Sequence, residues 1–192
     1  MTLITLVLLI SGLGNAPDPT PAALFERGTT YTAFVAGATA QRALWTTLTA
    51  SANVPEPLVS RLRRVGQGLR VVVVAEDWCL DSVNTLPFVA RLAAKAGVEL
   101  RIVNRQSGRS LLDAHPTRDG RVATPLILLL RETGDEAWIE RPAPLQQLFL
   151  AIASSPAAAR VVSSRQRWYD NDRGRTALEE IVTLAEQQHA RP

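Results

Sequence analysis

The chain has 192 residues, of which 46% are hydrophobic, 20% charged and 5% aromatic, with a net charge of +3. This composition is typical of a globular protein, and the length fits one domain with extensions. The basic residues are almost all Arg, and they are interleaved with acids rather than clustered. The sequence therefore predicts no nucleic-acid-binding surface.

Cysteine and histidine are scarce. Cys79 is the single cysteine, and His115 and His189 are the two histidines. One cysteine cannot form an intramolecular disulfide, and no zinc-ligand spacing exists. We therefore expect no metal and no bound cofactor, and Cys79 is either a buried small hydrophobe or a reactive thiol.

The chain begins with an apolar run, TLITLVLLI at residues 2–10. The run is too short to span a bilayer, so no stable membrane insertion is expected. It is similar to the apolar part of a signal peptide cleaved near Ala16, but no basic residue precedes it and Pro17 follows that position. For residues 1–20 we therefore keep three interpretations: a signal segment, a short hydrophobic arm, or a start codon assigned too far upstream. We expect a cytoplasmic protein, or an exported one if residues 1–16 are a signal peptide.

An N-terminal helical extension is predicted over residues 21–66. Apolar residues recur at helical spacing around Trp45 and Leu62, and prolines at 55 and 57 separate the two helices. Gly66 and Gly68 end the second helix.

The pattern then changes to strands and helices in alternation. LRVVVVA at 69–75 predicts a strand buried on both faces. A helix over 82–96, a strand over 98–103 and a helical turn near 110–114 follow it. Strands over 125–131 and 136–140, joined by a tight turn, and a helix over 144–153 complete the region.

This order defines an α/β fold with a four-stranded mixed sheet. A helical crossover makes the first two strands parallel, and the last two form a hairpin. Ligands of such sheets usually bind at the carboxyl ends of the parallel strands. Cys79 follows the first strand at that edge.

Two further helices are predicted at roughly 156–170 and 175–189, the second opened by a capping box from Thr176 to Glu179. Residues 67–154 would form the core and residues 155–192 a C-terminal helical extension, all within one globular domain.

The core resembles the thioredoxin superfamily. Trp78 and Cys79 follow the first strand, Pro87 lies eight residues after the cysteine, and Thr124-Pro125 precedes the third strand. Thioredoxins carry Trp-Cys, a helix-kinking proline and a cis-proline facing the thiol at these places. The resemblance therefore implies a thioredoxin-like fold with a cis Thr124–Pro125 bond.

A narrower resemblance is to a bacterial thioredoxin-like group with the signature E-D-W-C-G-D and a C-terminal helical extension. The segments AEDWCLDS and WYDNDRGRTALEEI carry it. Leu80 stands where the group usually has Gly, which restricts the local backbone and crowds the thiol.

The motif Cys79-Leu80-Asp81-Ser82 lacks the second cysteine of C-x-x-C, so the chain alone cannot cycle as a dithiol. A single thiolate can still exchange, reduce or isomerise a client's disulfide if an external thiol such as glutathione releases it. A helix N-terminus favours the thiolate, and Ser82 could donate a hydrogen bond to it. The nearby carboxylates of Asp77 and Asp81 oppose it.

Two interpretations remain, one enzymatic and one not. In the first, the protein acts on a protein disulfide or thiol. The predicted catalytic residues are Cys79, Ser82 and Asp77, and the predicted substrate-binding residues are Trp78, Leu80, Asp81, Thr124 and Pro125. In the second, the fold is a binding module for a protein partner and the cysteine is incidental.

Some residues also have simpler interpretations. Asp81 could only cap the helix, and Asp77 could be a turn residue. A third interpretation, an iron–sulfur cluster shared between two subunits as in C-G-F-S glutaredoxins, fits poorly because Leu80-Asp81 replaces Gly-Phe.

Overall fold

The computed structural model describes residues 18–191 and is built around a four-stranded sheet in the order β2-β1-β3-β4. Strand β1 (Arg70–Val74) pairs in parallel with β2 (Glu99–Val103) and antiparallel with β3 (Leu126–Arg131). Strand β3 forms the predicted hairpin with β4 (Gly134–Ile139). The predicted mixed sheet with flanking helices is confirmed.

The valine run of β1 is buried because helices cover both faces of the sheet. Val71 and Val73 belong to one apolar cluster, and Val72 and Val74 belong to the other. This alternation follows from the two-residue period of a strand.

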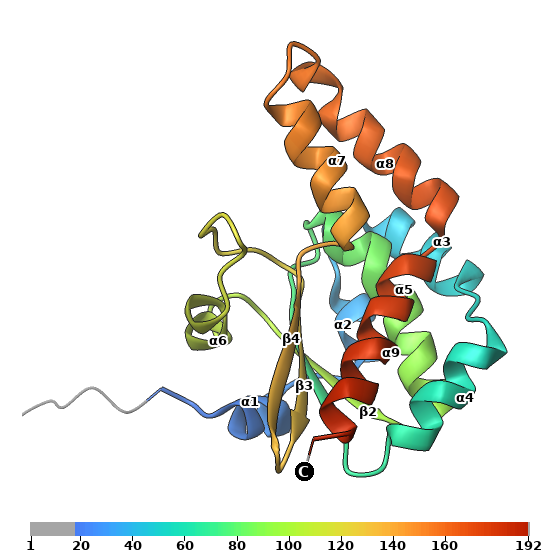
Figure 1. The fold of residues 1–192 in the computed structure, drawn as a ribbon, viewed down its shortest axis with the longest axis vertical. Coiled ribbons are helices and arrows are strands. Elements are labelled where there is room, and N and C mark those ends of the chain that lie inside the picture. The colour runs from blue at the N-terminus through green and yellow to red at the C-terminus, as the bar shows by residue number, and fades with distance from the viewer. Residues whose placement is uncertain (1–17, 192) are drawn as a thin grey trace, which may run out of the picture.

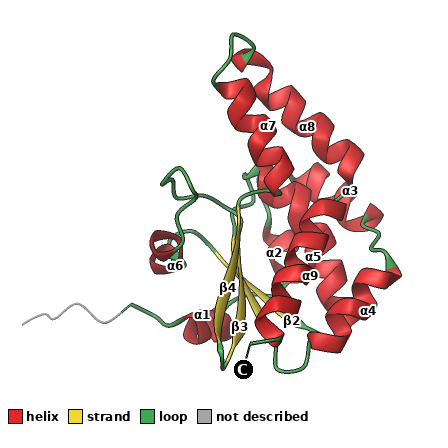
Figure 2. Cartoon of the chain, viewed as in Figure 1, coloured by secondary structure: helices red, strands yellow, loops and turns green. Residues whose placement is uncertain are grey.

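The larger cluster lies under four helices that Figures 1 and 2 show on one side of the sheet. They are α3 (Arg42–Ser51), α4 (Glu56–Val65), α5 (Leu80–Ala96) and α9 (Arg175–His189). The opposite face is covered by α1 (Pro21–Arg27) and α6 (Arg109–Ala114). Helix α5 is the crossover between the parallel strands, and its first residue follows Cys79.

The N-terminal helices are tied to the sheet at its β2 edge. After α1, the N–H of Thr29 donates to the carbonyl of Ile102 at 2.8 Å, and the N–H of Ile102 donates back at 2.8 Å. Helix α2 (Tyr31–Gly37) follows this bridge. The outer edge of β2 is therefore partly paired.

The C-terminal part contains a helical hairpin that extends away from the sheet (Figure 1). It consists of α7 (Ala143–Ala153), a 3₁₀ turn at Ala158–Arg160 and α8 (Val161–Asp172). Helix α9 then returns to the core, where Leu178 and Val182 are buried.

The start of α9 differs from the predicted capping box. Its N-cap is Gly174, and the carboxylate of Asp172 accepts the N–H of Thr176. Glu179 pairs with Arg61 instead of reaching back to the helix start. Gly174 has a φ of +77°, and a Cβ there would lie 2.4 Å from the ring of Phe88, so close packing requires glycine.

None of the helices within residues 18–191 is long and apolar enough to cross a bilayer. Residues 1–16, for which a signal peptide is the alternative interpretation, lie outside the described residues.

Candidate functional site

Cys79 lies at the carboxyl end of β1, where the chain turns into α5. It is the N-cap residue of the helix, and 8% of its surface is exposed. Its Sγ donates to the carbonyl oxygen of Thr124 at 3.2 Å. The Thr124–Pro125 peptide bond is cis. The structure therefore brings Cys79 next to the Thr124-Pro125 pair, which lies about 45 positions later in the sequence.

The first turn of α5 presents unused backbone N–H groups. The first helical bond runs from the N–H of Val83 to the carbonyl of Cys79 at 3.0 Å, and no side chain caps the helix. The N–H groups of residues 80–82 have no acceptor among residues 18–191. Open N–H groups and the helix dipole stabilise negative charge at this end.

Thr124 is buried next to the thiol, and only one of its two backbone groups is hydrogen-bonded. Its carbonyl accepts from Cys79, whereas its N–H has no hydrogen-bond acceptor within the described part of the chain. The following carbonyl, of Pro125, accepts the N–H of Glu140 at 2.7 Å. One donor is thus left free beside the sulfur.

The other residues of the motif lie around the thiol in different environments. Trp78 is 53% exposed, Leu80 is half-buried and Ser82 is fully buried. The Oγ of Ser82 has no hydrogen-bond partner among the described residues, so the expected hydrogen bond to Cys79 is not formed here.

Asp77 is directed toward the N-terminal extension. Its Oδ2 accepts the N–H groups of Thr39 at 2.7 Å and Ala40 at 2.9 Å. Its carbonyl accepts the indole N–H of the buried Trp45 at 2.9 Å. The N–H of Ala40 is the main cause that lowers the pKa of the Asp77 carboxyl group. Asp77 thus fastens the loop between α2 and α3 to the turn before the cysteine.

Asp81 is buried and is the centre of a charged cluster. Its Oδ2 accepts from Arg141 at 2.8 Å and from Arg165 at 3.3 Å, and its Oδ1 accepts the hydroxyl of Tyr169 at 2.8 Å. Arg165 and Tyr169 are on α8, so this acid fastens the helical hairpin to the first turn of α5. Burial and the adjacent Asp81 carboxylate raise the pKa of Tyr169.

Arg141 connects Asp81 to a second buried acid. Its Nη2 also donates to Glu140 at 2.5 Å, and its guanidinium lies 4.1 Å from the ring centre of Phe149. Arg121 completes the connection by donating to Glu140 at 3.0 Å. We call Asp81, Glu140, Arg141, Arg165 and Tyr169 the Asp81 cluster.

Sequence reasoning predicted Asp81 as a substrate-binding or capping residue and missed its partners. A buried carboxylate needs a cationic partner, but 20 arginines gave no indication of which one. The Trp168-Tyr169-Asp170 segment carries a resemblance to the bacterial group but no sequence signal for its contact with Asp81.

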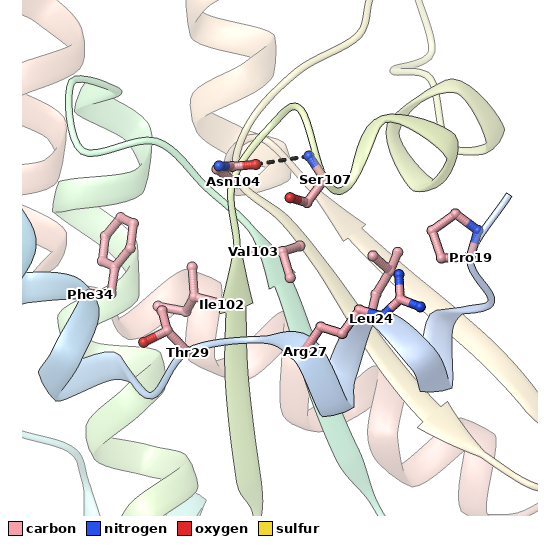
Figure 3. A pocket seen from close by; sticks show the side chains of 9 residues that line it. All are labelled: Pro19, Leu24, Arg27, Thr29, Phe34, Ile102, Val103, Asn104 and Ser107. Carbon is pink, nitrogen blue, oxygen red and sulfur yellow. Dashed lines mark hydrogen bonds between the residues drawn. The ribbon is translucent and has the colours of Figure 1, made fainter.

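A hollow of about 540 Å³ lies elsewhere, between α1 and the chain that follows β2 (Figure 3). Its polar side includes Asn104, whose Oδ1 accepts the N–H of Ser107 at 2.8 Å. None of the predicted site residues lines this hollow. Residues 18–191 also contain no group of three His, Cys, Asp or Glu side chains that could hold a metal ion.

The sheet order, the cysteine at the start of α5 and the cis-proline beside it define a protein of the thioredoxin fold with a single active-position cysteine. A family model described as Thioredoxin matches residues 28–160, and the chain belongs to this family. No curated protein matches the chain.

Two crystal structures share the fold. One is a protein of unknown function from Pseudomonas aeruginosa, with a TM-score of 0.67 and 23% identity. The other is an HIV epitope scaffold, with a TM-score of 0.63 and 23% identity. Each match covers 88% of this chain and 98% of the other chain.

Proposed function

We propose that the protein carries out monothiol disulfide exchange with Cys79 as the nucleophile. The observation that supports this proposal is the position of Sγ, 3.2 Å from the Thr124 carbonyl and at a helix start whose N–H groups are unused. A thiolate at this place would exchange its hydrogen bond to Thr124 for stabilisation by the open helix end.

The exchange balances without a second cysteine in the chain. The Cys79 thiolate attacks one sulfur of a client disulfide, forming a mixed disulfide and releasing the other client sulfur as a thiolate. An external thiol, for which glutathione is the simplest candidate, then attacks the mixed disulfide and releases the second client thiol. A second external thiol frees Cys79 and leaves as the oxidised dimer of the external thiol.

The client would be a protein segment that lies across the thiol in an extended conformation. The free N–H of Thr124 can donate to a client carbonyl beside the attacked disulfide. Trp78 offers an exposed aromatic surface next to the same position. We assign Asp77 and Asp81 to the support of the site, because their oxygens already accept hydrogen bonds from both extensions.

The experiment is turnover of a glutathionylated peptide in the presence of glutathione, with Cys79→Ser as the blank. The proposal expects turnover that depends on Cys79 and a trapped mixed disulfide of the protein when glutathione is left out. Substituting Ser82 by Cys is a matched gain-of-function control, since it restores the C-x-x-C spacing. Equal rates for the wild type and Cys79→Ser would refute the proposal.

The low exposure of Cys79 favours a second candidate function, a thioredoxin-fold binding module. An 8% exposed thiol that donates to a backbone carbonyl behaves as a small buried residue. Iodoacetamide labelling at pH 7 separates the two functions. Labelling of the native protein at the rate of a free thiol or faster supports exchange, and labelling only in denaturant supports the binding module.

A further inference from the structure

A second hollow, the β4 groove, lies along the free edge of the sheet. It has a volume of about 470 Å³ and is lined by residues 116–119, by residues 137–141 and by the first turns of α7. Figure 1 shows the chain between α6 and β3 beside β4, with α7 above it. Neither Cys79 nor Thr124 lines this groove.

The floor of the groove is an edge strand with unpaired backbone groups. Strand β4 is the last strand of the sheet, and the N–H of Glu140 donates to Pro125. In an antiparallel ladder such bonds fall on every second residue. The backbone N–H and C=O of Trp138 therefore also point toward β3, whereas those of Ala137 and Ile139 point away from it. The carbonyl of Ile139 accepts the N–H of Arg141. Among residues 18–191, the N–H of Ile139 and both backbone groups of Ala137 have no ladder partner.

The loop at residues 116–121, which lines the groove opposite α7, is held in place by hydrogen bonds. Arg121 donates to Asp119 at 2.6 Å and to Glu140 at 3.0 Å, which fastens the loop to the end of β4. The N–H of Thr117 closes the loop on the carbonyl of Arg121 at 2.9 Å. The edge is therefore recessed between two walls, which suits one extended chain better than the sheet of a second globular domain.

The unpaired charge at the groove is positive. Arg141 lines the groove, but its guanidinium is buried and already donates to Asp81 and Glu140. Arg118 is exposed and takes part in none of the ion pairs among residues 18–191. By contrast, the carboxylates that line the groove are already engaged: Asp119 and Glu140 by Arg121, and Glu180 by the indole of Trp138 at 2.7 Å. An occupant would meet the positive charge of Arg118 and the outward backbone groups of Ala137 and Ile139.

We propose that the β4 groove binds an acidic peptide segment of a partner protein, which adds to the sheet as a fifth strand. Its backbone would pair with Ala137 and Ile139, and one acidic side chain would accept from Arg118 at the rim. This binding uses no thiol chemistry and does not depend on the proposed exchange reaction.

The test uses the Cys79→Ser protein, so that binding is measured apart from disulfide exchange. The probe is a synthetic octapeptide of alternating Thr and Val with a central Glu, titrated to millimolar concentration while backbone amide signals are followed by NMR. We expect saturable shifts at Ala137 and Ile139. A counterpart with every amide N-methylated, which keeps the side chains but cannot pair, should not bind.

Charge reversal tests the acidic side chain. Arg118→Glu should weaken binding by about fivefold or more, since an exposed charge pair is lost and a repulsion gained. Arg91→Glu, the same change on an exposed residue of α5, should leave binding unchanged. Ala137→Pro removes the outward N–H on an edge strand that tolerates proline and should also weaken binding.

Three results would overturn the proposal. They are the absence of shifts at Ala137 and Ile139 at millimolar peptide, equal binding of the N-methylated counterpart, and shifts centred on Thr124 instead of β4.

Discussion

Two acids flank Cys79, and each fastens the turn at the thiol to a different extension of the fold. Asp77 accepts from backbone N–H groups of Thr39 and Ala40 in the N-terminal extension. Asp81 accepts from side chains of Arg141, Arg165 and Tyr169 in the C-terminal part. Asp77 is half-buried and hydrogen-bonded to neutral groups, whereas Asp81 is buried and paired with charges.

The difference between these two acids decides what their loss should cost. A carboxylate that accepts from amides at the surface supports one loop. A buried carboxylate shared by two guanidinium groups belongs to a cluster in which each charge needs the others. Loss of the Asp81 carboxylate or of its partners should therefore destabilise the protein more, and affect more distant residues, than loss of the Asp77 carboxylate.

The largest loss of folding stability is expected for Arg141→Met. It leaves the buried carboxylates of Asp81 and Glu140 short of a cation, and breaking a buried pair costs about 3–5 kcal/mol. The free energy of unfolding in urea measures this cost. The matched control is Arg61→Met, which removes ion pairs at the surface and should cost only about 0–1 kcal/mol. Equal losses for the two variants would contradict the comparison.

A smaller but more informative effect is expected for Asp81→Asn. The amide keeps the shape but loses the charge that holds Arg165 and Arg141, at a cost of about 2–3 kcal/mol. The α7–α8 hairpin should then open more often than the core. Trypsin should cut after Arg160, Arg165 and Arg167 before it cuts elsewhere. Cleavage spread evenly over the chain would instead indicate general unfolding.

The sequence predicted the sheet because its strands carry strong local patterns. The valine run of β1 and the Thr-Gly-Asp turn of the hairpin need no knowledge of distant contacts. The turn between β1 and α5 also placed Cys79 correctly at the carboxyl end of the strand.

The surroundings of the site could not be predicted in the same way. The partners of Asp81 come from residues 141, 165 and 169, and no periodicity connects a single acid to distant arginines. The contacts of Asp77 could not be predicted either, because Thr39 and Ala40 contribute backbone N–H groups that almost any residue type supplies. The assigned catalytic and substrate-binding roles remain predictions that the experiments on Cys79 test.

A local effect is expected for Asp77→Ala. The N–H groups of Thr39 and Ala40 lose a charged acceptor, and losses of this kind cost about 1–2 kcal/mol. Amide hydrogen exchange should accelerate at residues 39 and 40 and stay unchanged in α8. Faster exchange along α8 would show that Asp77 and Asp81 do not support separate parts of the fold.

The smallest effect is a pH dependence that belongs to Asp77. Its folded pKa lies below the unfolded value of about 3.9, so the unfolded chain binds the proton first as the pH falls. The stabilisation is therefore complete above the unfolded pKa and is lost as the pH falls toward the folded one. Urea unfolding of the wild type and Asp77→Asn at a series of pH values isolates this contribution, because all other acids are common to both. The stability difference between them should shrink below about pH 4, and a difference that stays constant into acid would mean that the Ala40 hydrogen bond does not favour the charged carboxylate.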